Sequence, residues 1–81
     1  MYKVKNRETK NYGTVIGIGE YCVNNKWKKL KNTVGNSKEP LTDEMLTDFI
    51  EKNNPVEINL IIQDKHGNIH RVDFPIEDLE N

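Results

Sequence analysis

Two histidines, His66 and His70, are the residues that most suggest a metal site. His66 lies in the polar segment Asp64-Lys65-His66-Gly67-Asn68, which is typical of a turn with a positive φ at its glycine. His70 follows in an expected strand, and residues four apart share a face on a helix but not across a hairpin turn. Asp64 or Asp73 could join them, but a catalytic zinc site needs three fixed protein ligands. We therefore predict no metal site and no cofactor.

The remaining reactive or phosphate-binding candidates are weaker. Cys22 has no histidine near it in sequence, which favours a small buried residue of a strand over a nucleophile. Gly17-Ile18-Gly19 lacks the third glycine of a dinucleotide-binding loop, because Cys22 occupies that position, so these glycines indicate a bend. The acid pairs, such as Asp43-Glu44 and Glu77-Asp78, lie in polar segments without an apolar pocket to raise a pKa. We expect a binding protein rather than an enzyme.

Charge is distributed unevenly along the 81 residues. Residues 1–38 carry nine Lys or Arg against two Glu, whereas residues 39–81 carry three Lys or Arg against eleven Asp or Glu. The net charge of −1 therefore hides two halves of opposite sign, which is the strongest compositional signal for an interaction surface.

The basic half predicts a nucleic-acid interface. Lysines surround the single tryptophan, and further cations and tyrosines precede it in the sequence. This combination suits nucleic acid, because clustered cations neutralise phosphates and flat exposed rings stack on bases. The competing interpretation is that the tryptophan anchors the core and the lysines are solvated partners of the acidic half. The candidate nucleic-acid-binding residues are Lys3, Lys5, Arg7, Lys26, Trp27, Lys28, Lys29 and Lys31.

The acidic half supports an alternative function. Carboxylates on a helix and a hairpin can imitate the charge of nucleic acid or dock on a basic protein surface. The protein would then be an inhibitor or adaptor of a host protein, such as a nuclease or defence complex. The candidate residues are Asp43, Glu44, Asp48 and Glu51. Both hypotheses require positive and negative side chains to occupy separate patches.

Length and composition set the remaining limits. The chain is expected to be one domain, residues 1–81, whose single cysteine excludes an internal disulfide and fits the reducing cytoplasm. No segment is apolar enough to suggest a membrane span or a signal peptide, and no small-molecule substrate is indicated. The Asn, Lys and Ile usage is typical of an AT-rich Gram-positive host or its phage, so we expect a gene of a phage or mobile element.

Five strands and one helix are expected to position these side chains. Alternating or β-branched runs predict strands over residues 2–5, 12–23, 26–31, 56–62 and 69–74. Thr42 as N-cap, acids in the first turn, a staple between Leu41 and Leu46, and a stop at Asn53-Asn54-Pro55 predict a helix over residues 42–54. Asn24-Asn25 predicts a tight hairpin turn.

This order of elements resembles an SH3-like small barrel of the KOW type and small prophage-encoded examples of that fold. The resemblance rests on Gly13-Thr14-Val15-Ile16-Gly17, on Gly67-Asn68-Ile69-His70-Arg71-Val72 and on the closing Ile76-Glu77-Asp78-Leu79. It implies an α+β fold: a five-stranded, mostly antiparallel, partly open barrel with one helix inserted before the last two strands. Minimal barrels of this kind usually lack that helix, which leaves open a plain sheet with a helix packed on one face.

Overall fold

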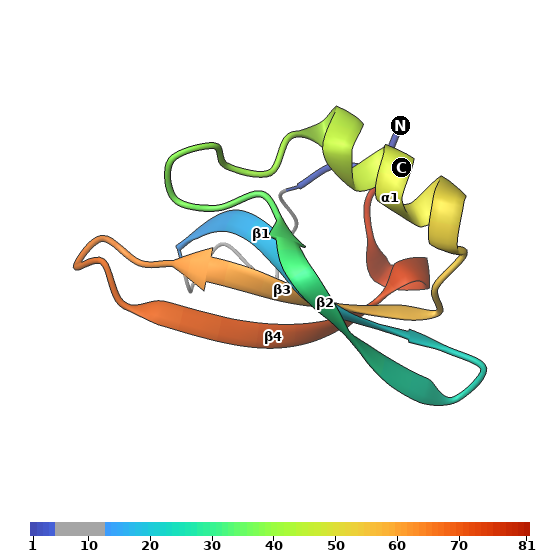
Figure 1. The fold of residues 1–81 in the computed structure, drawn as a ribbon. Coiled ribbons are helices and arrows are strands. Elements are labelled where there is room, and N and C mark those ends of the chain that lie inside the picture. The colour runs from blue at the N-terminus through green and yellow to red at the C-terminus, as the bar shows by residue number, and fades with distance from the viewer. Residues whose placement is uncertain (5–12) are drawn as a thin grey trace.

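The described residues form a four-stranded antiparallel sheet with one α-helix across one of its faces (Figure 1). The computed structural model describes residues 1–4 and 13–81. Helix α1 joins the second strand to the third, and a short 3-10 helix, η1, follows the fourth. The elements are β1 Thr14–Val23, β2 Lys26–Val34, α1 Asp43–Asn53, β3 Glu57–Gln63, β4 Ile69–Pro75 and η1 Ile76–Asp78, and the strands lie in the order β2-β1-β3-β4.

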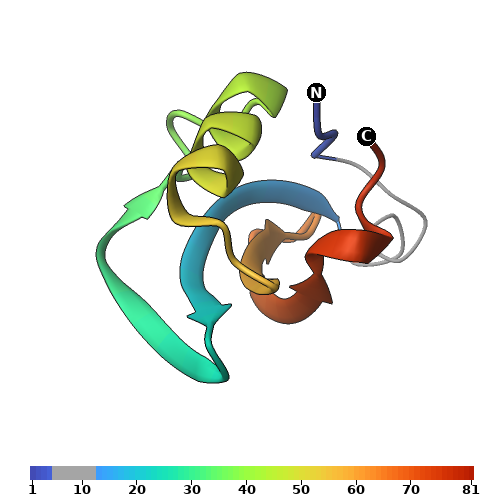
Figure 2. The same cartoon turned by 90° about the vertical axis from the view of Figure 1, so that its right-hand side faces the viewer.

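Strand β1 is strongly curved, as Figure 2 shows beneath α1. Its pairing with β3 contains two irregularities, which leave Ile16 and Gly19 as extra residues on β1. Such bulges bend a strand and increase its twist. Gly17 allows the bend, because a Cβ at this position would lie 2.7 Å from the carbonyl oxygen of Gly35. The predicted bend at the glycines is confirmed.

The hairpin between β1 and β2 turns at two asparagines. Asn24 and Asn25 have φ values of 53° and 62°. Two consecutive left-handed residues are the geometry of a type I′ turn, which matches the twist of the flanking strands. The turn sets Val23 opposite Lys26 and Cys22 opposite Trp27. The predicted hairpin is confirmed, although β2 extends three residues further than the expected strand over residues 26–31.

Helix α1 begins and ends where local chemistry predicts. The Thr42 side chain accepts a hydrogen bond of 3.1 Å from the Met45 amide. Asn54, with φ 46°, adopts the left-handed conformation and donates its amide to the Ile50 carbonyl at 2.8 Å. Leu41 and Leu46, the two staple positions, are both buried. Capping and the staple together hold the helix in one position on the sheet.

The core lies between α1 and one face of the sheet. Ile18, Ile58, Leu60, Ile62 and Leu46 are the largest fully buried side chains. Each contributes about 1.5–3 kcal/mol by leaving water. This face is therefore used for stability, which leaves the strand edges, the opposite face and the outer side of α1 for binding. No helix in residues 1–4 or 13–81 is long and apolar enough to cross a membrane.

The predicted five-stranded barrel is wrong: the described residues form four strands in one open sheet. Residues 2–4 are not a strand, because their amides bond to other elements. Tyr2 donates to Thr47 Oγ1 at 2.9 Å, Val4 to Asp43 Oδ1 at 2.8 Å, and Lys3 to the Glu80 carbonyl at 3.0 Å. Lys5, the last residue of that predicted strand, lies outside the described residues. The α+β class is confirmed, and the arrangement is a sheet with a helix packed on one face.

Candidate functional site

Strand β2 presents basic side chains on both of its faces. Directly opposed residues of an antiparallel pair share a face. Lys28 lies opposite Tyr21, whose ring packs edge-on against Phe49 of α1 with centroids 5.3 Å apart, so Lys28 stands on the helix side. Trp27 and Lys29 stand on the opposite, open face. The lysines therefore lie above and below one strand rather than on one flat surface.

Almost all of β2 is exposed. It is an edge strand that pairs only with β1 within the described part of the chain. Leu30 and Val34 are partly buried, whereas the other seven residues of the strand are exposed. The Trp27 side chain is 42% exposed, too open for the core anchor that the competing interpretation requires. An exposed ring between lysines can contact a ligand without any rearrangement.

Within the part of the chain that the structure describes, no ion pair neutralises the positive charge of β2. In residues 1–4 and 13–81 the ion pairs are Lys52–Asp48 at 3.1 Å and His70–Asp64 at 2.9 Å. None of the four lysines in β2 contacts a carboxylate in this part of the chain. Glu20 lies opposite Lys29 in the strand register but forms no ion pair with it. The β2 lysines therefore carry charge that no described carboxylate neutralises.

The structure brings together five of the eight predicted nucleic-acid-binding residues: Lys26, Trp27, Lys28, Lys29 and Lys31. Lys3 is elsewhere. Its amide bonds to Glu80, and in Figure 2 the N-terminus lies beside the C-terminus, across the body from β2. Lys5 and Arg7 lie outside the described residues. The candidate interface therefore consists of β2 alone.

The predicted acidic residues lie on α1 but do not all face outward in the same way. Glu44, Asp48 and Glu51 are exposed, and their spacing of four and three residues places them on one side of the helix. Asp48 pairs with Lys52, a largely exposed contact that contributes little to stability. Asp43 instead turns toward the N-terminal segment, where it accepts the Val4 amide.

The two histidines lie at the β3–β4 turn, where both are linked to Asp64. Asp64 Oδ1 accepts the amides of His66 and Asn68, both at 2.9 Å, and Asp64 Oδ2 lies 2.9 Å from His70 Nε2. The His70 hydrogen bond has the largest effect on the Asp64 pKa, desolvation opposes it, and the amides of Asn68 and His66 add to it, so that the pKa is lowered to about 2. The described residues contain no group of three or more metal-ligating side chains. Asp64 therefore organises the β3–β4 turn.

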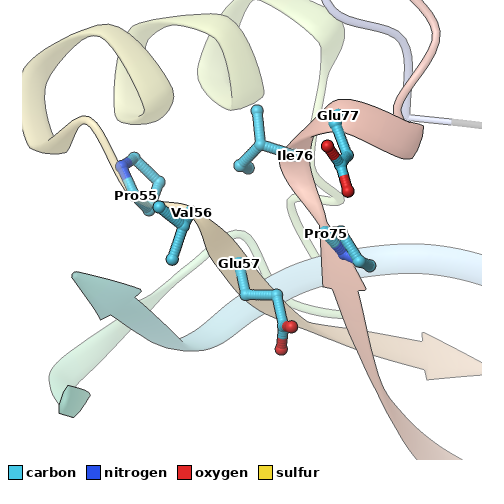
Figure 3. A pocket seen from close by; sticks show the side chains of 6 residues that line it. All are labelled: Pro55, Val56, Glu57, Pro75, Ile76 and Glu77. Atoms are coloured by element: carbon cyan, nitrogen blue, oxygen red, sulfur yellow. The ribbon is translucent and has the colours of Figure 1, made fainter. Parts of the chain in front are cut away.

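A shallow groove of about 430 Å³ lies where β3 begins and β4 ends (Figure 3). Its lining is apolar apart from two glutamates: Pro55, Val56, Glu57, Pro75, Ile76 and Glu77. The Val56 side chain is 59% exposed. Sequence reasoning missed this groove; the available signal was a proline followed by a β-branched residue at each of two strand ends. Its carboxylates do not suit a phosphate ligand.

A polar network covers the middle of the open face. The Asn59 side chain, only 6% exposed, donates to Asp73 Oδ1 at 2.8 Å and accepts from Arg71 Nη1 at 3.2 Å. Gly19 leaves room for the Arg71 guanidinium, which a Cβ would touch. The network satisfies a buried amide and joins β3 to β4. Sequence reasoning missed it, because it depends on the register of two strands.

Comparison of the chain with protein-family models, with curated proteins and with solved structures gave no match. The resemblance to KOW-type domains is therefore a prediction that no relative supports or opposes. Inferences about function rest on the geometry of β2 and α1.

Proposed function

We propose that the protein is a non-catalytic binding module that engages nucleic acid through β2. The observation that carries the proposal is the exposure of Lys26, Lys28, Lys29 and Lys31, together with Trp27, on one edge strand without a carboxylate partner in the described residues. Unpaired lysines are free to replace the counterions of phosphates, and this exchange supplies most of the affinity in non-specific binding.

The separation of charge supports this proposal. The lysines from 26 to 31 span about 17 Å along β2 at the usual rise per residue. The exposed carboxylates of α1 point away from the sheet that the helix covers. At 0.1 M salt, charges more than about 10 Å apart in solvent are largely screened. A ligand on β2 is therefore attracted by its nearest lysines more strongly than it is repelled by α1.

A salt titration tests the proposal. Binding of a fluorescein-labelled 20-nucleotide oligonucleotide is followed by anisotropy from 10 mM to 300 mM salt. With about four phosphates neutralised, a plot of log affinity against log salt should have a slope of about −3 to −4. Binding that does not respond to salt, or no binding at 10 mM, would remove the proposal.

A second candidate function is binding of a basic protein surface by α1, with a host nuclease or defence complex as the kind of partner. The observation that favours it is the exposed row Glu44, Asp48 and Glu51. Like charges at these spacings disfavour a helix by a few tenths of a kcal/mol per pair. Only Asp48 is compensated by a lysine among the described residues. A row of this kind is consistent with selection for a partner rather than for helix stability.

This second function is separated from the first by capture from a bacterial lysate with and without nuclease. A partner that survives nuclease treatment and is lost with Glu44→Lys/Glu51→Lys would support it. Both residues are exposed, and neither side chain forms a hydrogen bond or ion pair with the described residues. Glu77→Lys/Asp78→Lys, a pair of exposed changes outside α1 with the same change in net charge, is the matched control. Loss of the captured partner on nuclease treatment would favour nucleic-acid binding through β2 instead.

A further inference from the structure

The open face beside β2 does not suit a nucleic-acid duplex. The register places Lys29, Glu20, Asn59 and Asp73 in one row across β2, β1, β3 and β4. Neighbouring strands are about 4.8 Å apart, so Asp73, three strands away, stands about 14 Å from β2. A duplex separates its two phosphate rows by a major groove about 12 Å wide. If the phosphates of one DNA strand contacted the β2 lysines, the phosphates of the other strand would lie close to Asp73 on β4.

A second row of side chains leads to the same conclusion. Trp27 lies opposite Cys22, and Cys22 lies opposite Glu57 at the mouth of the glutamate-flanked groove. A duplex centred on Trp27 would bring phosphates toward Glu57. Like charges brought together at an interface oppose binding. Beyond β2 this face carries three carboxylates, those of Glu20, Glu57 and Asp73, against one guanidinium, that of Arg71, so it suits phosphates less well than β2 does.

The outer edge of β2 suits one flexible chain. Lysines on the two faces of an edge strand can contact phosphates from above and below, while the ligand stays on the side away from Glu20 and Asp73. Trp27 lies between Lys26 and Lys28 with its side chain 42% exposed. Exposed aromatic rings stack on bases of any identity, and unpaired bases are available only in a single strand.

We infer that β2 binds single-stranded nucleic acid, with the strand along its outer edge and one base stacked on Trp27. This inference rests on the proposed nucleic-acid function and specifies its ligand. The bases contribute through stacking, so the inference also implies tolerance of sequence.

The test uses the intrinsic fluorescence of Trp27, the only tryptophan in the chain. At 20 mM salt the protein is titrated with a 20-nucleotide single strand, with the corresponding duplex, and with an abasic strand that keeps the phosphates but has no bases. DNA and RNA single strands of the same sequence show which sugar is preferred. The expected result is quenching by the single strands only, with weaker binding of the duplex and of the abasic strand.

Anisotropy measurements on variants supply an independent readout. Trp27→Ala should weaken binding of the single strand by roughly 5- to 150-fold, the equivalent of one lost stacking contact. Trp27→Phe keeps a ring and should recover most of that loss, and neither change should affect the abasic strand. Val56→Ala, at another exposed apolar residue, is the matched control. Thermal melting of each variant checks that it folds.

Three results would overturn the inference. Salt-dependent binding of all three ligands with equal affinity, or without a change in Trp27 fluorescence, would leave the nucleic-acid function in place but exclude a stacked single strand. A polyglutamate peptide that binds as tightly as the oligonucleotide would mean that β2 recognises an acidic protein segment. No binding to any nucleic-acid ligand at 20 mM salt would remove the proposed function and this inference together.

Discussion

Asp64 is a candidate metal ligand in the sequence, whereas in the fold its side chain holds the β3–β4 turn together. Its carboxylate accepts hydrogen bonds from two backbone amides and lies within hydrogen-bond distance of the His70 ring, so both of its oxygens are engaged. These contacts favour the charged form and lower its pKa from 3.8 to about 2. The polar composition of the segment predicted the turn, whereas the contact with His70 depends on how the turn closes.

The Asp64 contacts predict a pH dependence. Because the pKa is lowered in the folded state, they stabilise the protein fully above about pH 4 and lose that effect as pH falls toward 2. Asp64→Asn should therefore lower the free energy of unfolding at pH 7, and the gap from wild type should shrink between pH 4 and pH 2. Urea unfolding of both proteins across this range measures the gap. A gap that stays constant down to pH 2 would contradict the assignment.

At the scale of elements, local signals were sufficient for the helix and the turns but not for the sheet. Thr42 and Asn54 fix the ends of α1 through contacts within a few residues, so their roles can be predicted from sequence. Residues 2–4 have the alternation of a strand, but their amides bond to Thr47, Asp43 and Glu80, more than 35 residues away. Only the long-range pairing decides whether a barrel closes.

The curvature of β1 gives a prediction with an internal control. Gly17→Ala would bring a Cβ to 2.7 Å from the Gly35 carbonyl oxygen, a backbone atom that cannot move freely. We expect it to lower the free energy of unfolding by about 1–3 kcal/mol. Gly19→Ala meets the end of the Arg71 side chain instead, so its expected cost is about 0.5–1.5 kcal/mol, the loss of one hydrogen bond.

Urea unfolding of the two glycine variants, monitored by circular dichroism, compares them directly. Equal destabilisation by the two changes, or a larger effect at Gly19, would show that the Gly35 backbone does not exclude a side chain at position 17 of β1.

At the scale of the whole molecule, the lysines of β2 and the exposed carboxylates of α1 lie on different elements. The basic side chains of β2 lie along one sheet edge, and the exposed carboxylates of α1 lie on the outer side of the helix. The composition predicted this division, but it could not show that Lys3 belongs to the opposite side of the body from β2. The order of charges along the sequence therefore does not define a charged surface until the fold shows which segments lie together.

Neutralising the acidic side of α1 separates the two functions. The variant Glu44→Gln/Asp48→Asn/Glu51→Gln should bind nucleic acid more tightly than wild type at 10 mM salt, where charges interact over about 30 Å. The difference should vanish near 0.15 M, because the screening length falls to about 8 Å. Anisotropy titrations at both salt concentrations measure it. Weaker binding of the variant at low salt would place α1 inside the interface.

The most direct test of the account compares two variants of equal net charge. Lys28→Gln/Lys29→Gln removes two lysines from β2, and Lys38→Gln/Lys65→Gln removes two exposed lysines from loops. Salt titration with a single-stranded oligonucleotide should show the slope of log affinity against log salt reduced in magnitude by about 1.4 for the β2 variant and nearly unchanged for the loop variant. Equal changes in the two variants would contradict the assignment of the interface to β2.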